Sequence, residues 1–566
     1  MRYELNNKLY YAANALIFIL IVCCCAYFSR YNAFFADDLG YSLYPAEIRL
    51  FETLNPQSKF SAFYVHGGGY LCLFLTRFFN AELPYMLNIH PADFIGIPEG
   101  IIKGAFASAV FFMISKFSVF QNKSKILMIS AYIFSFSYFL YFNFKTEAYL
   151  LAVNHSFYRY IFPLLLLLPA LNFIYKTAVL KLKLSYNQMA AAAVCALLLG
   201  ASNEFIFYTI IFFCIILIIY NSLIKTFFKN ADKDALYALN GYFYKPFAFL
   251  IISASAFVFS PGSLAVMDMR GLGSINITMS DIKEFTALFF KNCVFDISAY
   301  WIVYIFALAA AVYSASKNKK LKEVLFPLFY TVSLCSFMYS LILCGKTFYN
   351  EGGYWILHAN LITLYYTLLL IPLYMYLDFT AVNTDFLKHR TKAFGISALL
   401  ISAGLLCAAF KNTEGNFYHQ EGGKLSKIRA VNYIADKISR YMLLSDADVI
   451  LPIQLKQISP EKLSYYIWLR GFEDYQNADC TKTGVLITNY YPLMYKEKVS
   501  DDVKYCFSGD AAERFYNLGG YFTYDELKNI NFGRLKNNDF LFNQNIKKHE
   551  IIPAEKLNQD LFNNLL

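Results

Sequence analysis

Long apolar runs separated by short polar stretches dominate the first 410 residues of the chain. Most of these runs come close to the roughly 20 apolar residues that an α-helix needs to cross a bilayer. Charged residues collect between the runs rather than within them. The pattern predicts eleven membrane-spanning helices, at residues 9–28, 99–117, 125–144, 157–175, 187–201, 205–222, 246–260, 298–315, 323–344, 355–377 and 392–410.

The segment between the first two predicted spans, 29–98, has a different pattern. It mixes apolar and polar residues, contains five prolines between Pro45 and Pro98, and is interrupted by Gly67-Gly68-Gly69. Its apolar stretch 70–79 is too short to cross a bilayer alone. We therefore expect short helices that lie along the membrane surface.

Lysine and arginine are concentrated in every second loop between the predicted spans. Such loops face the cytoplasm in bacterial membrane proteins. Lys123, Lys181, Lys229, Lys319 and Lys388 each lie in one of them. We therefore expect a multi-pass membrane protein with its amino end in the cytoplasm and residues 411–566 on the outer face.

The predicted outer tail, 411–566, is more polar than the rest of the chain. Strand-like runs at 448–452 and 484–488 alternate with helical stretches, which is typical of a small α/β domain. Cys480 and Cys506 are the tail's only cysteines. They form a disulfide or remain two thiols, and the sequence leaves both alternatives open.

The composition agrees with a lipid environment. The chain has 566 residues, of which 58% are hydrophobic and 16% charged, whereas soluble proteins carry about 25% charged residues. The net charge of +10 comes with lysines clustered in short loops, so it reflects topology rather than nucleic-acid binding. No nucleotide-binding loop or nucleic-acid motif is present.

Asp37 and Asp38 follow the first predicted span at the depth where lipid tails give way to headgroups. Carboxylates in that position are expensive unless they face a wet cavity or a partner, so they indicate function. One of them can act as a general base toward a hydroxyl, and both offer oxygen ligands to a divalent cation such as Mg²⁺ or Mn²⁺. Alternatively, the pair forms an exposed turn or caps the next helix.

Glu204 lies in a very short turn between two predicted spans, after Ser202 and Asn203. Backbone that turns at membrane depth is tolerated only inside protein or beside water, so we interpret Glu204 as a site residue, with a structural ion pair as the alternative. Arg270 follows Pro261-Gly262 and either binds a phosphate or reaches toward the membrane interface. Other polar residues expected at the same outer face are His66, Lys145, His155 and Arg159.

These features occur in an order that resembles the GT-C superfamily of membrane glycosyltransferases, over roughly residues 10–410. The signposts are Ala36-Asp37-Asp38-x-x-Tyr41, Asn154-x-x-x-Tyr158, Gly200-Ala201-Ser202-Asn203-Glu204, and Pro261-Gly262-Ser263 with Arg270 downstream. They are similar to those of a bacterial, largely uncharacterised branch of the superfamily.

The resemblance implies an inverting glycosyltransferase that acts at the outer face of a bacterial inner membrane. Its donor is a sugar on a polyprenyl-phosphate carrier, and its acceptor is an envelope glycan, a lipid or a protein. Asp37 and Asp38 would then be catalytic, with a divalent cation as a further option, and Tyr41, Asn203 and Glu204 would help bind substrate. Two other classes remain open: a transporter or flippase of a lipid-linked or anionic solute, and a non-catalytic envelope assembly protein.

Overall fold

The fold was analysed in a computed structural model of the whole chain. It describes residues 7–30, 32, 70–87, 89, 94–117, 125–145, 150–151, 154–178, 185–227, 278–318, 321–348, 354–383, 385–415, 449–452 and 549–552.

Helices account for nearly all of the described chain. In sequence order they are α1 (Asn7–Ser29), α4 (Tyr70–Arg77), η3 (Phe78–Glu82), α5 (Leu83–Met86), α7 (Ile97–Ser115), α8 (Lys125–Lys145), α9 (Asn154–Tyr160), α10 (Leu164–Ala178), α11 (Tyr186–Gly200), α12 (Glu204–Phe227), α16 (Met279–Phe289), η5 (Phe290–Phe295), α17 (Ser298–Lys317), α18 (Leu321–Phe348), α19 (Tyr354–Asn383) and α20 (Asp385–Gly415). The segments η3 and η5 are π-helical.

Seven of the helical segments in the described chain are long and apolar enough to cross a membrane. They lie at Asn7–Ser29, Ile97–Ser115, Lys125–Lys145, Asn154–Phe173, Ser298–Lys317, Glu323–Leu343 and Ala359–Ala381. The protein is therefore an α-helical, multi-pass membrane protein. The predicted spans 187–201, 205–222 and 392–410 coincide with helices α11, α12 and α20, and 246–260 lies outside the described residues. The count of eleven stays a prediction.

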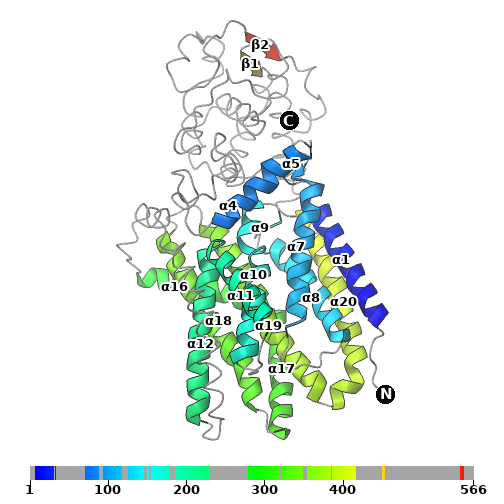
Figure 1. Cartoon of the computed structure of the whole chain (residues 1–566), viewed down its shortest axis with the longest axis vertical. Coiled ribbons are helices and arrows are strands. Elements are labelled where there is room, and N and C mark those ends of the chain that lie inside the picture. The colour runs from blue at the N-terminus through cyan, green and yellow to red at the C-terminus, as the bar shows by residue number, and fades with distance from the viewer. Residues whose placement is uncertain are drawn as a thin grey trace.

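Helix α19 is at the centre of the bundle. Of its most apolar stretch, 94% is buried, and α17, α18, α20 and α8 all pack against it (Figure 1). Two tyrosine hydroxyls inside the bundle bond to backbone carbonyls: Tyr300 donates to Leu369 (2.8 Å) and Tyr376 to Val324 (3.1 Å). A buried hydroxyl needs such a partner because no water or lipid group can replace it.

Local sequence signals explain where several helices begin. Ser185 accepts a hydrogen bond from the Gln188 amide, and the Gln188 side chain accepts one from the Ser185 amide, which together form a capping box at the start of α11. Thr278 and Asp281 form the same motif at α16. At α7, Pro98 lies in the first turn, where its missing amide hydrogen costs nothing.

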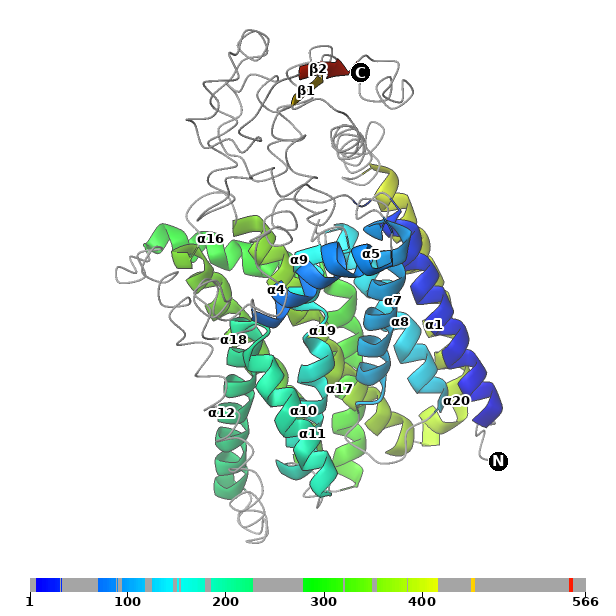
Figure 2. The same cartoon turned by 45° about the horizontal axis from the view of Figure 1, so that its top comes forward.

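The helices α4 and α5 run across one end of the bundle rather than along it (Figure 2). The Leu71 amide, in the first turn of α4, donates to the Ala201 carbonyl at 2.6 Å. This bond joins α4 to the turn between α11 and α12. The expectation that these helices lie along a membrane surface stays a prediction.

Two glycines allow α1 and α7 to lie unusually close together. A β-carbon on Gly100 would lie 2.7 Å from the Ser29 β-carbon, and one on Gly104 would lie 2.7 Å from the Val22 α-carbon. Close backbone approach at paired small residues is how membrane helices gain packing energy, since lipid supplies no hydrophobic drive between them. The spacing of Gly100 and Gly104 by four places both on one helical face.

Beyond the end of α20 at Gly415, residues 411–566 are described at two short strands, β1 (Val449–Pro452) and β2 (His549–Ile552), which pair in parallel with Val449 opposite His549. β1 coincides with the strand expected at 448–452. The strand expected at 484–488, Cys480 and Cys506 all lie outside the described residues. The α/β domain and its place on the outer face therefore remain predictions.

Gly104→Ala should destabilise the bundle because the new methyl group meets the α1 backbone, which cannot rotate away. We expect a loss of about 1–3 kcal/mol, measured as a lower midpoint in thermal unfolding of the detergent-solubilised protein. The matched control is Gly404→Ala in α20, where an added β-carbon meets nothing within 4 Å. Equal midpoints for the two variants would contradict the close α1–α7 contact.

Candidate functional site

Buried polar side chains gather where α1 and α8 end and α7, α9 and α12 begin. We call this region the polar end of the bundle. Helices α4 and α5 cross it (Figure 2). The polar side chains buried there include Asn32, Asn80, Glu99, Lys103, Asn154, His155 and Asn203.

Glu99, in the first turn of α7, is fully buried. Its carboxylate accepts a hydrogen bond from the Tyr158 hydroxyl at 3.0 Å and another from the Asn154 amide. Asn154 and Tyr158 stand four residues apart on α9, so both face the same way. A carboxylate at the start of a helix is also favoured by the helix dipole.

Lys103 lies one turn after Glu99, about 9 Å into α7, and is also fully buried. Its ammonium donates to the Leu151 carbonyl at 2.8 Å and to the Asn154 side-chain oxygen. Asn154 thus accepts from Lys103 and donates to Glu99. Opposite charges four residues apart, joined through one amide, form a compensated pair that can be kept inside a membrane protein.

Two further asparagines tie neighbouring segments to this cluster. The Asn154 amide donates to the Asn80 side-chain oxygen at 2.7 Å, and Asn80 lies in the π-helical segment η3. Asn32, just beyond α1, donates to the Leu151 carbonyl at 2.8 Å. The cluster therefore fixes both flanks of the loop that carries Asp37 and Asp38 in the sequence.

A salt bridge between Arg77 and Glu82 spans the π-helical segment η3, whose geometry brings the two side chains together. Arg77 donates to the Glu82 carboxylate at 3.2 Å. The two residues are five apart, which matches the i to i+5 repeat of a π-helix. Short π-helical segments within α-helices often occur at functional sites.

His155 was expected at the site, and it lies at the polar end, buried against α4. Its Nδ1 is 3.4 Å from the Cys72 sulfur. Its neighbour Ser156 accepts a hydrogen bond from Asn360 of α19 at 3.2 Å. Successive residues of α9 thus contact α7, α4 and α19, which makes this short helix the junction of the polar end.

Arg159 and Asn203, expected to lie together, do so. The Asn203 amide donates to the Arg159 carbonyl at 3.0 Å, and Asn203 is fully buried. This bond holds the turn between α11 and α12 against the end of α9. Backbone that turns at this depth is satisfied inside the protein, as the short turn required.

Lys145, another expected site residue, forms an ion pair with Asp296 at 3.3 Å. The pair links the end of α8 to the end of η5. Because both side chains are partly exposed, the pair contributes about 0–1 kcal/mol to stability. It orients Lys145 at the edge of the polar end.

Several expected site residues lie outside the described residues: Asp37, Asp38, Tyr41, His66 and Arg270. Glu204 begins α12, and the structure describes its backbone but not its side chain. The acidic pair and its role in metal binding therefore remain predictions. Among the described residues, no three His, Cys, Asp or Glu side chains come together as a group that could hold a metal ion.

The sequence interpretation missed Glu99, Lys103, Asn80 and Cys72. A signal for the first two was available, since an ionisable residue inside an apolar span is a candidate site by default. Asn80 and Cys72 had no such signal. Their segment, 70–82, has few charges, and only the fold brings it against α9.

No protein-family model, curated protein or solved structure matches this chain. The class of protein is therefore defined by the structure itself: an α-helical, multi-pass membrane protein with a buried ionisable cluster at one end of its bundle.

Lys103→Met should destabilise the protein strongly, because Glu99 would stay buried without the cation that compensates it. We expect a loss of about 3–5 kcal/mol in the free energy of unfolding. The readout is the fraction of monodisperse protein that survives heating in detergent, followed by size-exclusion chromatography. Lys291→Met, at an exposed position in η5, is the matched control and should change stability by less than about 0.5 kcal/mol. A Lys103→Met variant as heat-resistant as this control would contradict the cluster's role.

Proposed function

We propose that the protein is a glycosyltransferase that moves a sugar from a polyprenyl-phosphate carrier to an envelope glycan, lipid or protein. In this proposal the reaction takes place at the polar end of the bundle, on the outer face of a bacterial inner membrane. Residues 1–410 form the catalytic module, and the tail, 411–566, helps to hold the acceptor.

The observation that supports the proposal best is the convergence of residues from separate predicted outer loops. Asn32, Asn80, Asn154, His155 and Asn203 come from four different segments and lie at one end of the bundle. A reaction between a lipid-borne donor and an acceptor outside the membrane needs such a one-sided site. Asn32, five residues before Asp37, anchors the start of the acidic loop there.

The distribution of charge favours this class over a transporter. Secondary transporters bind substrate near the middle of the membrane, often at charged groups and broken helices. Here the charges of the described spans stay near their ends: no Asp, Glu, Lys or Arg lies between Lys103 and Lys116 in α7, or between Lys125 and Lys145 in α8. Central helix α19 likewise carries none from Tyr354 to Leu377.

The proposed mechanism is a single displacement. The carrier's chain stays in the bilayer and its phosphate binds Arg270, whose guanidinium suits phosphate oxygens. The acceptor hydroxyl attacks the anomeric carbon while Asp37 or Asp38 takes its proton. The bond from that carbon to the phosphate oxygen breaks, the phosphate leaves with the electron pair, and Arg270 stabilises its charge. Attack opposite the leaving group inverts the anomeric configuration.

The variant with both Asp37→Asn and Asp38→Asn should lose transferase activity by a factor of about 10² to 10⁴, since amides cannot accept the proton. The measurement is the amount of surface glycan in cells that carry only the variant, at matched membrane levels, with mass spectrometry of accumulated lipid-linked sugar. Glu284→Gln, at an exposed position in α16, serves as control and should leave both readouts unchanged. Normal glycan in the double variant would end the enzyme proposal.

Arg270→Ala should weaken use of the donor while leaving the protein folded. With one charge-assisted contact to the phosphate removed, we expect a decrease in kcat/KM of about tenfold or more, partly restored by Arg270→Lys. Donor titration in proteoliposomes measures it. An unchanged dependence on donor concentration would remove Arg270 from the site.

A further inference from the structure

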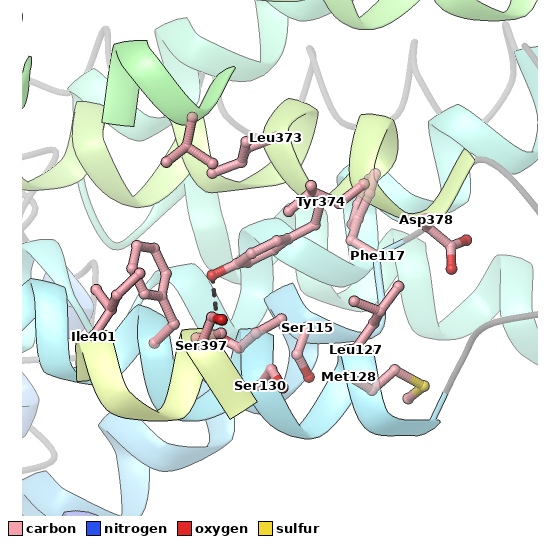
Figure 3. Close-up of a pocket in the computed structure, with 15 residues that line it drawn as sticks. Ser115, Phe117, Leu127, Met128, Ser130, Leu373, Tyr374, Asp378, Ser397 and Ile401 are labelled. Atoms are coloured by element: carbon pink, nitrogen blue, oxygen red, sulfur yellow. Dashed lines mark hydrogen bonds between the residues drawn. The ribbon is translucent and has the colours of Figure 1, made fainter. Parts of the chain in front are cut away.

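A cavity of about 120 Å³ opens between α8, α19 and α20, in the half of the bundle away from the polar end. Ser115 at the end of α7 and Phe117 just beyond it line the cavity, as do residues from the first half of α8 and the second half of α19 (Figure 3). It plays no part in the proposed transfer reaction.

Hydrocarbon makes up most of the cavity wall, and its polar members are Ser115, Ser130, Tyr374, Ser397 and the buried Asp378. Leu127, Phe134, Leu373 and Leu377 make up much of the wall. The Tyr374 hydroxyl on its wall is already committed, since it donates to the Ala131 carbonyl at 3.0 Å (dashed line in Figure 3). The Ser115 hydroxyl donates to the Phe112 carbonyl at 2.7 Å. Because the Tyr374 and Ser115 hydroxyls have partners within the protein and most of the wall is apolar, the cavity suits an apolar occupant.

The cavity opens on the side that faces lipid. Ser397 and Ile401 of α20 line it and are themselves exposed, and their neighbours Ile396 and Leu400 are 59% and 68% exposed. In the predicted span 392–410, a helix face with such large exposed apolar side chains borders on acyl chains, not water. The medium at the opening is therefore hydrocarbon.

The dimensions of the cavity suit a segment of a lipid acyl chain. From Leu127 to Phe134 the wall extends about 10 Å along α8, which is within the roughly 15 Å thickness of one leaflet's hydrocarbon. An apolar cavity of about 150 Å³ takes up one benzene molecule, so this cavity holds a segment of roughly four or five carbons. An empty cavity would forfeit the dispersion contacts of its walls.

We propose that this cavity binds an acyl chain of a bilayer phospholipid from the leaflet at the α7–α8 connection. The acyl chain enters beside the exposed Ser397 and Ile401 of α20 and packs against Tyr374 and Leu377. The bound lipid fills the space between α20 and central helix α19. This inference is independent of the proposed glycosyl transfer.

The test uses the full chain in vesicles of phosphatidylethanolamine and phosphatidylglycerol that contain a trace of phosphatidylethanolamine with a diazirine on one acyl chain. After illumination, mass spectrometry of peptides locates the adducts. We expect adducts on residues 127–134 and 397–401. Ala398→Phe, which fills the cavity from α20, should reduce the adducts on 127–134 about tenfold.

Leu400→Phe is the matched control on the same helix, because Leu400 is exposed and does not line the cavity; it should leave the adducts unchanged. If Ala398→Phe fails to fold, Ala131→Leu narrows the cavity from α8 instead. Adducts on 127–134 that survive both cavity variants would overturn the proposal, as would an unlabelled cavity. If undecaprenyl phosphate displaces the label but phospholipid does not, the proposal is also overturned. The occupant of the cavity is then the carrier lipid.

Discussion

The side chain of Asn154 joins the two ionisable groups that the bundle keeps away from water. Its oxygen accepts from Lys103, and its amide donates to Glu99 and Asn80. A charge inside a membrane protein is costly when isolated and tolerable when paired and hydrogen-bonded. Three segments that are distant in sequence must therefore come together at Asn154, and their meeting defines the polar end.

The rest of the architecture supports that junction. The paired glycines of α7 bring α1 close, which places Asn32 over the Leu151 carbonyl. The buried helix α19 reaches α9 through Asn360 and Ser156. Because lipid offers no hydrogen bonds, the side-chain amides of Asn32 and Asn360 donate to partners within the chain. The same rule leaves the opposite half of the bundle free to present apolar surface and an apolar cavity to lipid.

The two ends of the bundle thus have different chemistry. The polar end contains buried amides and charges beneath the helices α4 and α5. The wall of the cavity beside α20 is mostly hydrocarbon, and its Tyr374 and Ser115 hydroxyls donate to backbone carbonyls. In the half of the bundle away from the polar end, the proposed phospholipid acyl chain would pack against α19. Its dispersion contacts would help to hold α19 and α20 in place.

The sequence by itself determined where the helices lie, because an apolar run that crosses lipid must be helical. Helices lie at ten of the eleven predicted ranges, and 246–260 is outside the described residues. The sequence also indicated that His155, Arg159 and Asn203 share one end, since alternating spans bring their loops to one side. Only the tertiary structure decided that Glu99 and Lys103 meet Asn154 and that Asn80 and Cys72 reach α9. Those contacts depend on how the helices pack. Packing brings together residues that are distant in the sequence and follow no common helical repeat.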